Sequence, residues 1–122
     1  MYEYKAKITS VYDGDTITGD IDCGFGVWLH KAKMRLLGVD TAEIRGGTAA
    51  TKEKAYAARD YVRSVVLDQE VIVCTAKKGK YGRWLVTVWL IDDNGHKQAE
   101  SLNEALIRLG HAVRYMTSPP VC

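Results

Sequence analysis

One uninterrupted helical pattern, set between the third and fourth of five strand-like segments, most constrains the fold of this chain. Thr48 or Thr51 can cap a helix that runs to about Leu67, because apolar residues recur on one face at helical spacing. These residues are Ala55, Ala58, Val62, Val65 and Val66. No Gly or Pro interrupts the segment, so one continuous helix is predicted.

Apolar periodicity and turn residues predict strands at 5–12, 16–23, 27–39, 70–75 and 84–91. The first three lie close enough in the chain to form a meander. Ser101 and Glu104 have the spacing of a capping box that opens a short second helix, and Gly110 is placed to end it. Five strands with a helix after the third match the order of an OB-type barrel. We therefore expect an α+β fold, a five-stranded β-barrel with two or three packed helices.

Length and composition fit one globular domain that covers residues 1–122. The chain has 122 residues, of which 47% are hydrophobic and 26% charged. Its formal charge of +2 does not by itself indicate a nucleic-acid-binding protein. A local basic run is compatible either with a cationic face or with a solvated turn. It contains Lys77, Lys78, Lys80 and Arg83.

Other sequence features point to a soluble protein. The start of the chain lacks the basic and apolar regions of a signal peptide, and no apolar run is long enough to cross a membrane. We expect a monomer, either intracellular or secreted after removal of a leader. Three widely spaced cysteines support neither a disulfide framework nor a zinc site. The tryptophans are expected in the barrel core or wall; they are Trp28, Trp84 and Trp89.

Two acidic segments lie at the ends of predicted strands. Side chains at strand ends leave the core and can contact a ligand. Asp13 and Asp15 lie in a turn, and Asp40 and Glu43 follow an apolar strand that contains Arg35. Each segment alone is usually structural, because Asp-Gly-Asp is a common turn and Asp-Thr-Ala-Glu resembles a helix start. Their occurrence together with arginines favours a functional site.

The residue types indicate phosphodiester chemistry. Carboxylates without His or Cys form a hard-oxygen site that suits Ca²⁺, Mg²⁺ or Mn²⁺ rather than Zn²⁺. The guanidinium groups of Arg35 and Arg83 can each hold two phosphate oxygens and stay charged at any working pH. Glu43 beside a cation stays ionised and could accept a proton from water. Whether Glu43 is a general base or only positions the water is left open.

Four ordered blocks, spread over roughly residues 7 to 115, resemble the signature blocks of the staphylococcal nuclease family. They are Asp13-Gly14-Asp15-Thr16, Arg35-Leu36-Leu37-Gly38-Val39-Asp40-Thr41-Ala42-Glu43, Lys80-Tyr81-Gly82-Arg83 and Asn103-Glu104-Ala105-Leu106-Ile107-Arg108-Leu109-Gly110. The resemblance implies an OB barrel and a calcium-dependent endonuclease with low sequence specificity. Its substrates would be single-stranded DNA and RNA, and also double-stranded DNA, and its products would carry 3′-phosphates.

The resemblance also implies how one Ca²⁺ ion would be bound. Asp15, Asp40 and the backbone carbonyl of Thr41 would be its ligands. Asp13 would lie in the outer shell and act through water. Ala42 departs from the family pattern, in which a proline is usual, so the loop that holds the ligands loses a backbone restriction.

The other roles implied by the resemblance concern the substrate. Arg35 and Arg83 would bind the phosphate oxygens, and Glu43 would orient or deprotonate the attacking water. Three further residues, Lys80, Tyr81 and Tyr115, would contact the nucleotide near the cleaved bond.

Two other functions are compatible with such a chain. One is a catalytically weak OB-type module that binds nucleic acid or a protein partner, and the other is a purely structural barrel. A binding module has no use for Asp15, Asp40 and Glu43 beside phosphate-binding arginines, because unneutralised carboxylates weaken the binding of a polyanion. A structural barrel leaves all of these charges unexplained. The nuclease is therefore the favoured hypothesis.

Overall fold

The computed structural model of the protein describes residues 2–42, 48–78 and 82–114. Its seven strands are β1 (Tyr2–Asp13), β2 (Thr16–Asp22), β3 (Trp28–Leu36), β4 (Val39–Thr41), β5 (Glu70–Lys78), β6 (Trp84–Leu90) and β7 (Ala112–Arg114). Its two helices are α1 (Ala49–Val66) and α2 (Leu102–Arg108).

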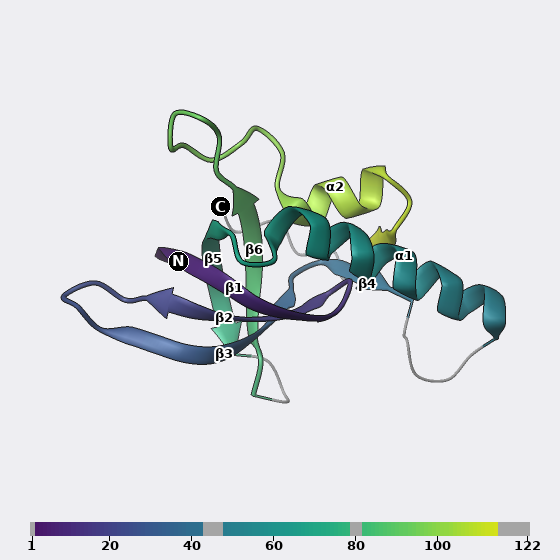
Figure 1. Cartoon of the computed structure of the whole chain (residues 1–122), viewed down its shortest axis with the longest axis horizontal. Coiled ribbons are helices and arrows are strands. Elements are labelled where there is room, and N and C mark those ends of the chain that lie inside the picture. Colours follow the sequence, from purple (N-terminus) through teal and green to yellow (C-terminus); the bar gives the residue numbers. More distant parts are fainter. Residues whose placement is uncertain (1, 43–47, 79–81, 115–122) are drawn as a thin grey trace.

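Five strands close into a barrel in the order β1-β2-β3-β6-β5. Strands β3 and β6 are parallel, and the other neighbours are antiparallel. Figure 1 shows the β2–β3 hairpin extending away from the barrel on the side opposite the N-terminal end of α1. The predicted five-stranded OB-type barrel with packed helices is confirmed.

The barrel interior is filled by alternate strand residues, and both helices add to this core. Fully buried members include Ile8, Ile17, Met34, Leu36, Val73, Val86, Val62, Val66, Leu102 and Leu106. Burying one aliphatic side chain of this size stabilises the fold by roughly 1.5–3 kcal/mol. The ring of Tyr61 on α1 stacks on that of His111 after α2, with centroids 5.2 Å apart.

Both predicted helix starts are confirmed. Thr48 caps α1, because its Oγ1 accepts the backbone N–H of Thr51 at 3.3 Å. Ser101 caps α2 by accepting the N–H of Glu104 at 3.2 Å. Both carboxylate oxygens of Glu104 also accept hydrogen bonds from Arg114, and this pair joins α2 to β7.

The strand predicted at 27–39 is in fact two strands. Gly38 has a φ of +77°, a conformation that favours glycine, and the turn at Leu37 and Gly38 ends β3 at Leu36. Strand β4 then pairs with β7 in a separate two-stranded sheet that the sequence did not predict. This break places Asp40 and Thr41 on β4, outside the barrel wall.

The expectation about the cysteines was wrong. Cys74 is buried and disulfide-bonded, whereas Cys23 is exposed and free. Spacing along the chain does not show which cysteines a fold brings together. Trp28 lies on β3 in the barrel wall, one of the two places expected for the tryptophans, and it is 46% exposed. Neither helix in the described part of the chain combines the length and apolar character needed to cross a membrane.

Candidate active site

One turn and two strands bring the candidate residues together at one end of the barrel. Asp15 lies in the turn that leads into β2, Arg35 lies near the end of β3, and Asp40 lies on β4. The β2–β3 register pairs Thr16 with Arg35, and the backbone N–H of Leu36 donates to the carbonyl of Asp15 at 2.9 Å. The pairing of β2 with β3 therefore sets the distance between the Asp15 and Arg35 side chains.

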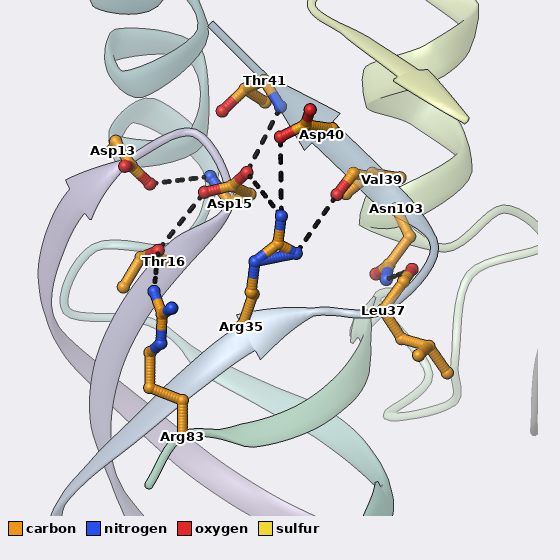
Figure 2. A network of polar contacts seen from close by, with 10 residues as sticks. All are labelled: Asp13, Asp15, Thr16, Arg35, Leu37, Val39, Asp40, Thr41, Arg83 and Asn103. Atoms are coloured by element: carbon orange, nitrogen blue, oxygen red, sulfur yellow. Dashed lines mark hydrogen bonds and ion pairs between the residues drawn. The ribbon is translucent and has the colours of Figure 1, made fainter. Parts of the chain in front are cut away.

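Asp15 lies at the centre of a network of polar contacts that joins these segments (Figure 2). Its carboxylate is buried, and Oδ2 accepts the backbone N–H of Thr41 at 3.2 Å and a guanidinium N–H of Arg35 at 3.5 Å. Its Oδ1 accepts the hydroxyl of Thr16 at 3.2 Å. Both oxygens of this buried charge thus have partners, as a stable interior requires.

Arg35 lies between two carboxylates. Its Nη2 is 3.5 Å from Asp15 Oδ2 and 3.5 Å from Asp40 Oδ1, while Nη1 donates to the carbonyl of Val39 at 3.5 Å. These distances lie at the long end of the hydrogen-bond range, so attraction between opposite charges contributes more than directional bonding. The guanidinium supplies positive charge between the two acids.

Asp13 adds a third carboxyl group to the same turn. Its Oδ1 accepts the backbone N–H of Asp15 at 3.1 Å. Burial, followed by the hydrogen bond and negative charge of Asp15, raises the pKa of Asp13 from 3.8 to about 6. A bound cation would oppose this shift, because it favours the ionised carboxylate.

Gly14 allows this turn to pack closely against α1 and β4. A Cβ atom on Gly14 would lie 2.8 Å from the Cβ of Ala58 and 2.8 Å from the Cγ2 of Thr41. Real Cβ contacts are essentially never below 3.0 Å, so any larger residue displaces one of these neighbours. The turn needs glycine for space.

Arg83, just before β6, joins the network from the other side. Its Nη1 lies 3.5 Å from the hydroxyl of Thr16, which itself donates to Asp15. Thr16 and Asp15 together therefore link the two arginines predicted to bind phosphate. The sequence assigned Thr16 no role, although its place opposite Arg35 follows from the β2–β3 register.

Asn103 is a second residue whose role the sequence did not show. It is 5% exposed, its Oδ1 accepts the N–H of Val88 at 3.0 Å, and its Nδ2 donates to the carbonyls of Leu37 at 2.8 Å and Val86 at 3.1 Å. These bonds join α2 and β6 to the turn that precedes β4. Asn103 thereby fixes the backbone from which Asp40 projects. The capping-box pattern around it explains only the helix start.

The donor set suits a hard cation. Asp15 and Asp40 carry carboxylate oxygens, the ligand type that hard cations prefer, and the buried hydroxyl of the neighbouring Thr41 has no hydrogen-bond partner among the described atoms. Within residues 2–42, 48–78 and 82–114, however, no group of three or more His, Cys, Asp or Glu side chains has metal-binding geometry. Glu43, Lys80, Tyr81 and Tyr115 lie outside the described residues, so their predicted roles stay predictions.

Family comparison agrees with this arrangement. A model of the staphylococcal nuclease homologue family matches residues 33–121. The chain belongs to the staphylococcal nuclease family. The matched region contains Arg35, Asp40, Arg83 and Asn103, and it confirms the resemblance found in the signature blocks.

Two curated relatives extend the comparison. An uncharacterized protein of Methanocaldococcus jannaschii is 30% identical over 135 residues, which cover 94% of this chain and 61% of the relative. The protein ParB of Escherichia coli is 26% identical over 115 residues, which cover 93% of this chain and 58% of ParB. The chain thus spans about three fifths of the length of these two relatives.

Proposed function

We propose that this chain is a calcium-dependent endonuclease that hydrolyses phosphodiester bonds of DNA and RNA with low sequence specificity. The observation that carries the proposal is that the guanidinium of Arg35 lies 3.5 Å from both Asp15 and Asp40, while Asp15 also accepts the backbone N–H of Thr41. Family membership supports it independently. Single-stranded DNA and RNA are the proposed main substrates, with double-stranded DNA also cut.

One Ca²⁺ ion would be held by Asp15, Asp40 and the carbonyl of Thr41, with Asp13 acting through water. When bound, it would neutralise the phosphate and stabilise charge that grows on its oxygens. A hydrogen bond from the backbone N–H of Thr41 to Asp15 holds these two proposed ligand residues next to each other, which supports the proposal. The raised pKa of Asp13 is consistent with a place built for positive charge.

The two arginines would bind the phosphate that is cleaved. Arg35 and Arg83 reach the site from β3 and from the segment before β6, and Thr16 lies between them. Guanidinium groups on two sides would stabilise the negative charge of the transition state and fix the phosphate for in-line attack. Glu43 would orient the attacking water or remove its proton, and 3′-phosphate products would result.

Three further residues would hold the nucleotide next to the cleaved bond, namely Lys80, Tyr81 and Tyr115. Contacts to the backbone and to base faces carry little sequence information, which accounts for the proposed low specificity.

Digestion of labelled single-stranded DNA and RNA tests the proposal. Wild type, Glu43→Ala and Arg83→Ala should be compared in Ca²⁺, Mg²⁺ and EDTA, with Lys97→Ala as a charge control in the loop between β6 and α2. We expect cleavage that depends on Ca²⁺, survives Lys97→Ala and is lost by orders of magnitude in the other two variants. End-labelling should reveal 3′-phosphates.

Two results would contradict the nuclease. Cleavage in EDTA, or cleavage indifferent to both site substitutions, would overturn the mechanism. Tight binding of oligonucleotides without any cleavage would instead identify the chain as a catalytically weak binding module of nuclease ancestry.

A further inference from the structure

The tip of the β2–β3 hairpin, residues 23–29, exposes a cluster of apolar side chains. Its four large apolar residues are each at least 43% exposed; they are Phe25, Val27, Trp28 and Leu29. No charged residue occurs between Asp22 and His30. Figure 1 shows this hairpin extending away from the barrel, so the cluster lies at the end of a protrusion. Contiguous apolar patches of this kind mark sites of interaction.

Phe25 has a backbone conformation that is unfavourable for a bulky residue. Its φ is +56°, and the neighbouring Gly24 and Gly26 have φ values of +83° and +74°. Glycine adopts this left-handed region freely, whereas a large side chain is strained there. The Phe25 ring is fully exposed, so burial within the protein does not offset the strain. Strain that the fold itself does not use is typical of positions that serve a function.

The backbone of the tip is partly satisfied from within. The N–H of Cys23 donates to the carbonyl of Val27 at 2.8 Å, and the N–H of Val27 donates to the carbonyl of Gly24 at 2.9 Å. The N–H of Gly24 donates to Asp22 Oδ1 at 2.9 Å. Backbone groups without partners are costly in an apolar medium. These bonds therefore lower the cost of moving the tip out of water.

Charges of both signs follow the tip along the hairpin. Asp20 and Asp22 lie on β2, and Lys31 and Lys33 lie on β3, so the strands next to the tip carry no large surplus of either sign. The order is an uncharged apolar end followed by a zone of balanced charge. A lipid bilayer has the complementary order, because zwitterionic headgroups of both signs cover its apolar interior.

We propose that the hairpin tip inserts into the interface of a lipid bilayer. Phe25 and Val27 enter the boundary between headgroups and acyl chains, and Trp28 lies at the level of the headgroups, where its apolar ring and polar N–H are both accommodated. Phe25 is three residues beyond Asp22, a reach of at most ~10 Å. Apolar faces that lie in a membrane interface are buried by roughly 5–10 Å. Contact of this depth needs no element that crosses the membrane.

The direction of the hairpin leaves the candidate active site in water. Strand β2 starts at Thr16, beside Asp15, and ends next to the tip, and β3 returns from the tip toward Arg35. The length of β2 puts about 20 Å between the tip and that end of the barrel. An anchored chain therefore keeps its candidate site accessible. The inference does not rest on the proposed nuclease activity.

A second copy of the chain fits the tip less well. The groove beside Trp28 has a volume of about 530 Å³ and is lined mainly by ionisable side chains, namely Lys7, Asp20, His30, Asp68 and Glu70. A phenyl ring inserted there would remove water from these groups without giving them a polar partner. A lipid interface accepts a convex apolar tip without a preformed pocket.

Sedimentation with lipid vesicles tests the proposal. The chain is mixed, in EDTA and without nucleic acid, with sucrose-loaded vesicles of phosphatidylcholine, or of phosphatidylcholine with phosphatidylglycerol, at low and high salt. The variants are Phe25→Asn, Trp28→Phe and Val113→Ser. Val113 is the matched control, because it is 66% exposed and lies on β7, which pairs with β4 and not with the hairpin. Thermal melting of each variant verifies that it is folded.

We expect wild type to bind both kinds of vesicle with similar affinity at either salt concentration, because apolar insertion drives the contact. Phe25→Asn should weaken binding about tenfold or more, the effect of losing one buried aromatic side chain. Its melting temperature should not fall, since Asn tolerates a left-handed φ. Trp28 emission should shift to shorter wavelength on vesicles, and Trp28→Phe should lose this shift but still bind. Val113→Ser should match wild type.

Four results would overturn the proposal. Wild type that sediments with neither vesicle excludes the membrane, and equal binding by Phe25→Asn excludes the tip. Binding that needs phosphatidylglycerol and disappears at high salt assigns the contact to the lysines rather than to the apolar tip. A dimer that forms in solution without vesicle binding, and that Phe25→Asn abolishes, assigns the tip to a second copy of the chain.

Discussion

The carboxylate of Asp15 accepts the backbone N–H of Thr41 at 3.2 Å, and this bond joins the turn before β2 to the short strand β4. It connects two proposed metal ligands through the protein itself. The same carboxylate oxygen receives Arg35, so the geometry of the whole site depends on one buried acid.

Asp15→Asn should separate the structural role of this residue from its role as a ligand. The amide oxygen can still accept the Thr41 N–H, but the negative charge is lost. We expect a melting temperature close to wild type in EDTA and loss of the rise that Ca²⁺ produces. For wild type that rise corresponds to about 2.7 kcal/mol when Ca²⁺ is at 100 times its Kd. Thermal melts across a CaCl₂ titration measure it.

Asp22→Asn is the matched control, because Asp22 lies at the far end of β2. It should keep the full Ca²⁺ response. An undiminished response in Asp15→Asn would show that this acid is not a metal ligand.

Gly14→Ala should destabilise the protein by about 1–3 kcal/mol, the usual cost of overpacking. The new methyl group lies within 2.8 Å of both Ala58 and Thr41, and neither contact involves the end of a flexible side chain. Urea unfolding measures the loss. Adding Thr41→Ser, which removes one of the two clashing methyl groups, should recover part of it, and a purely additive double mutant would contradict the packing argument.

Asn103→Ala should lower the free energy of unfolding by on the order of 3 kcal/mol, because the Val88 N–H and the Leu37 carbonyl lose their Asn103 partner, whereas the Val86 carbonyl keeps the N–H of Leu37. It should also weaken Ca²⁺ binding, since the Leu37 carbonyl that it holds lies three residues before Asp40. Calcium titration of the folded variant at low temperature separates the two effects. Gln98→Ala, at an exposed position, is the control and should change neither quantity.

The raised pKa of Asp13 predicts how stability depends on pH without metal. Between 3.8 and about 6 the folded state binds more protons than the unfolded state. Stability should therefore fall as the pH rises through this window, and the full penalty should be present above it. Asp13→Asn removes this slope, and the variant should be more stable relative to wild type at pH 7 than at pH 4.

Urea unfolding in EDTA from pH 3.5 to 7.5 tests this prediction. Adding Ca²⁺ should reduce the difference between variant and wild type at neutral pH, because the ion stabilises the ionised Asp13 carboxylate. Parallel pH profiles for the two proteins would show that Asp13 titrates normally.

The features that could be predicted from the sequence are those that neighbouring residues control. The helical spacing from Ala55 to Val66 and the caps at Thr48 and Ser101 act within one or two turns of chain, so they can be predicted from neighbouring residues. Five apolar segments in the right order were sufficient to predict the barrel. The sequence also named Asp13, Asp15, Arg35 and Asp40, which the structure brings together, although their chemical roles stay predictions.

Other features depend on strand register and on contacts between distant segments, and they became visible in the folded structure alone. The left-handed turn at Gly38 divides the third predicted strand, the bulge opposite Asp20 turns Trp28 outward, and Asn103 reaches the turn before β4 across 66 residues. A local sequence pattern cannot predict these relationships. In each of them a buried polar group or a strand pairs with a distant segment of the chain. Long-range pairing therefore gives the site its geometry, while the local sequence supplies its chemical groups.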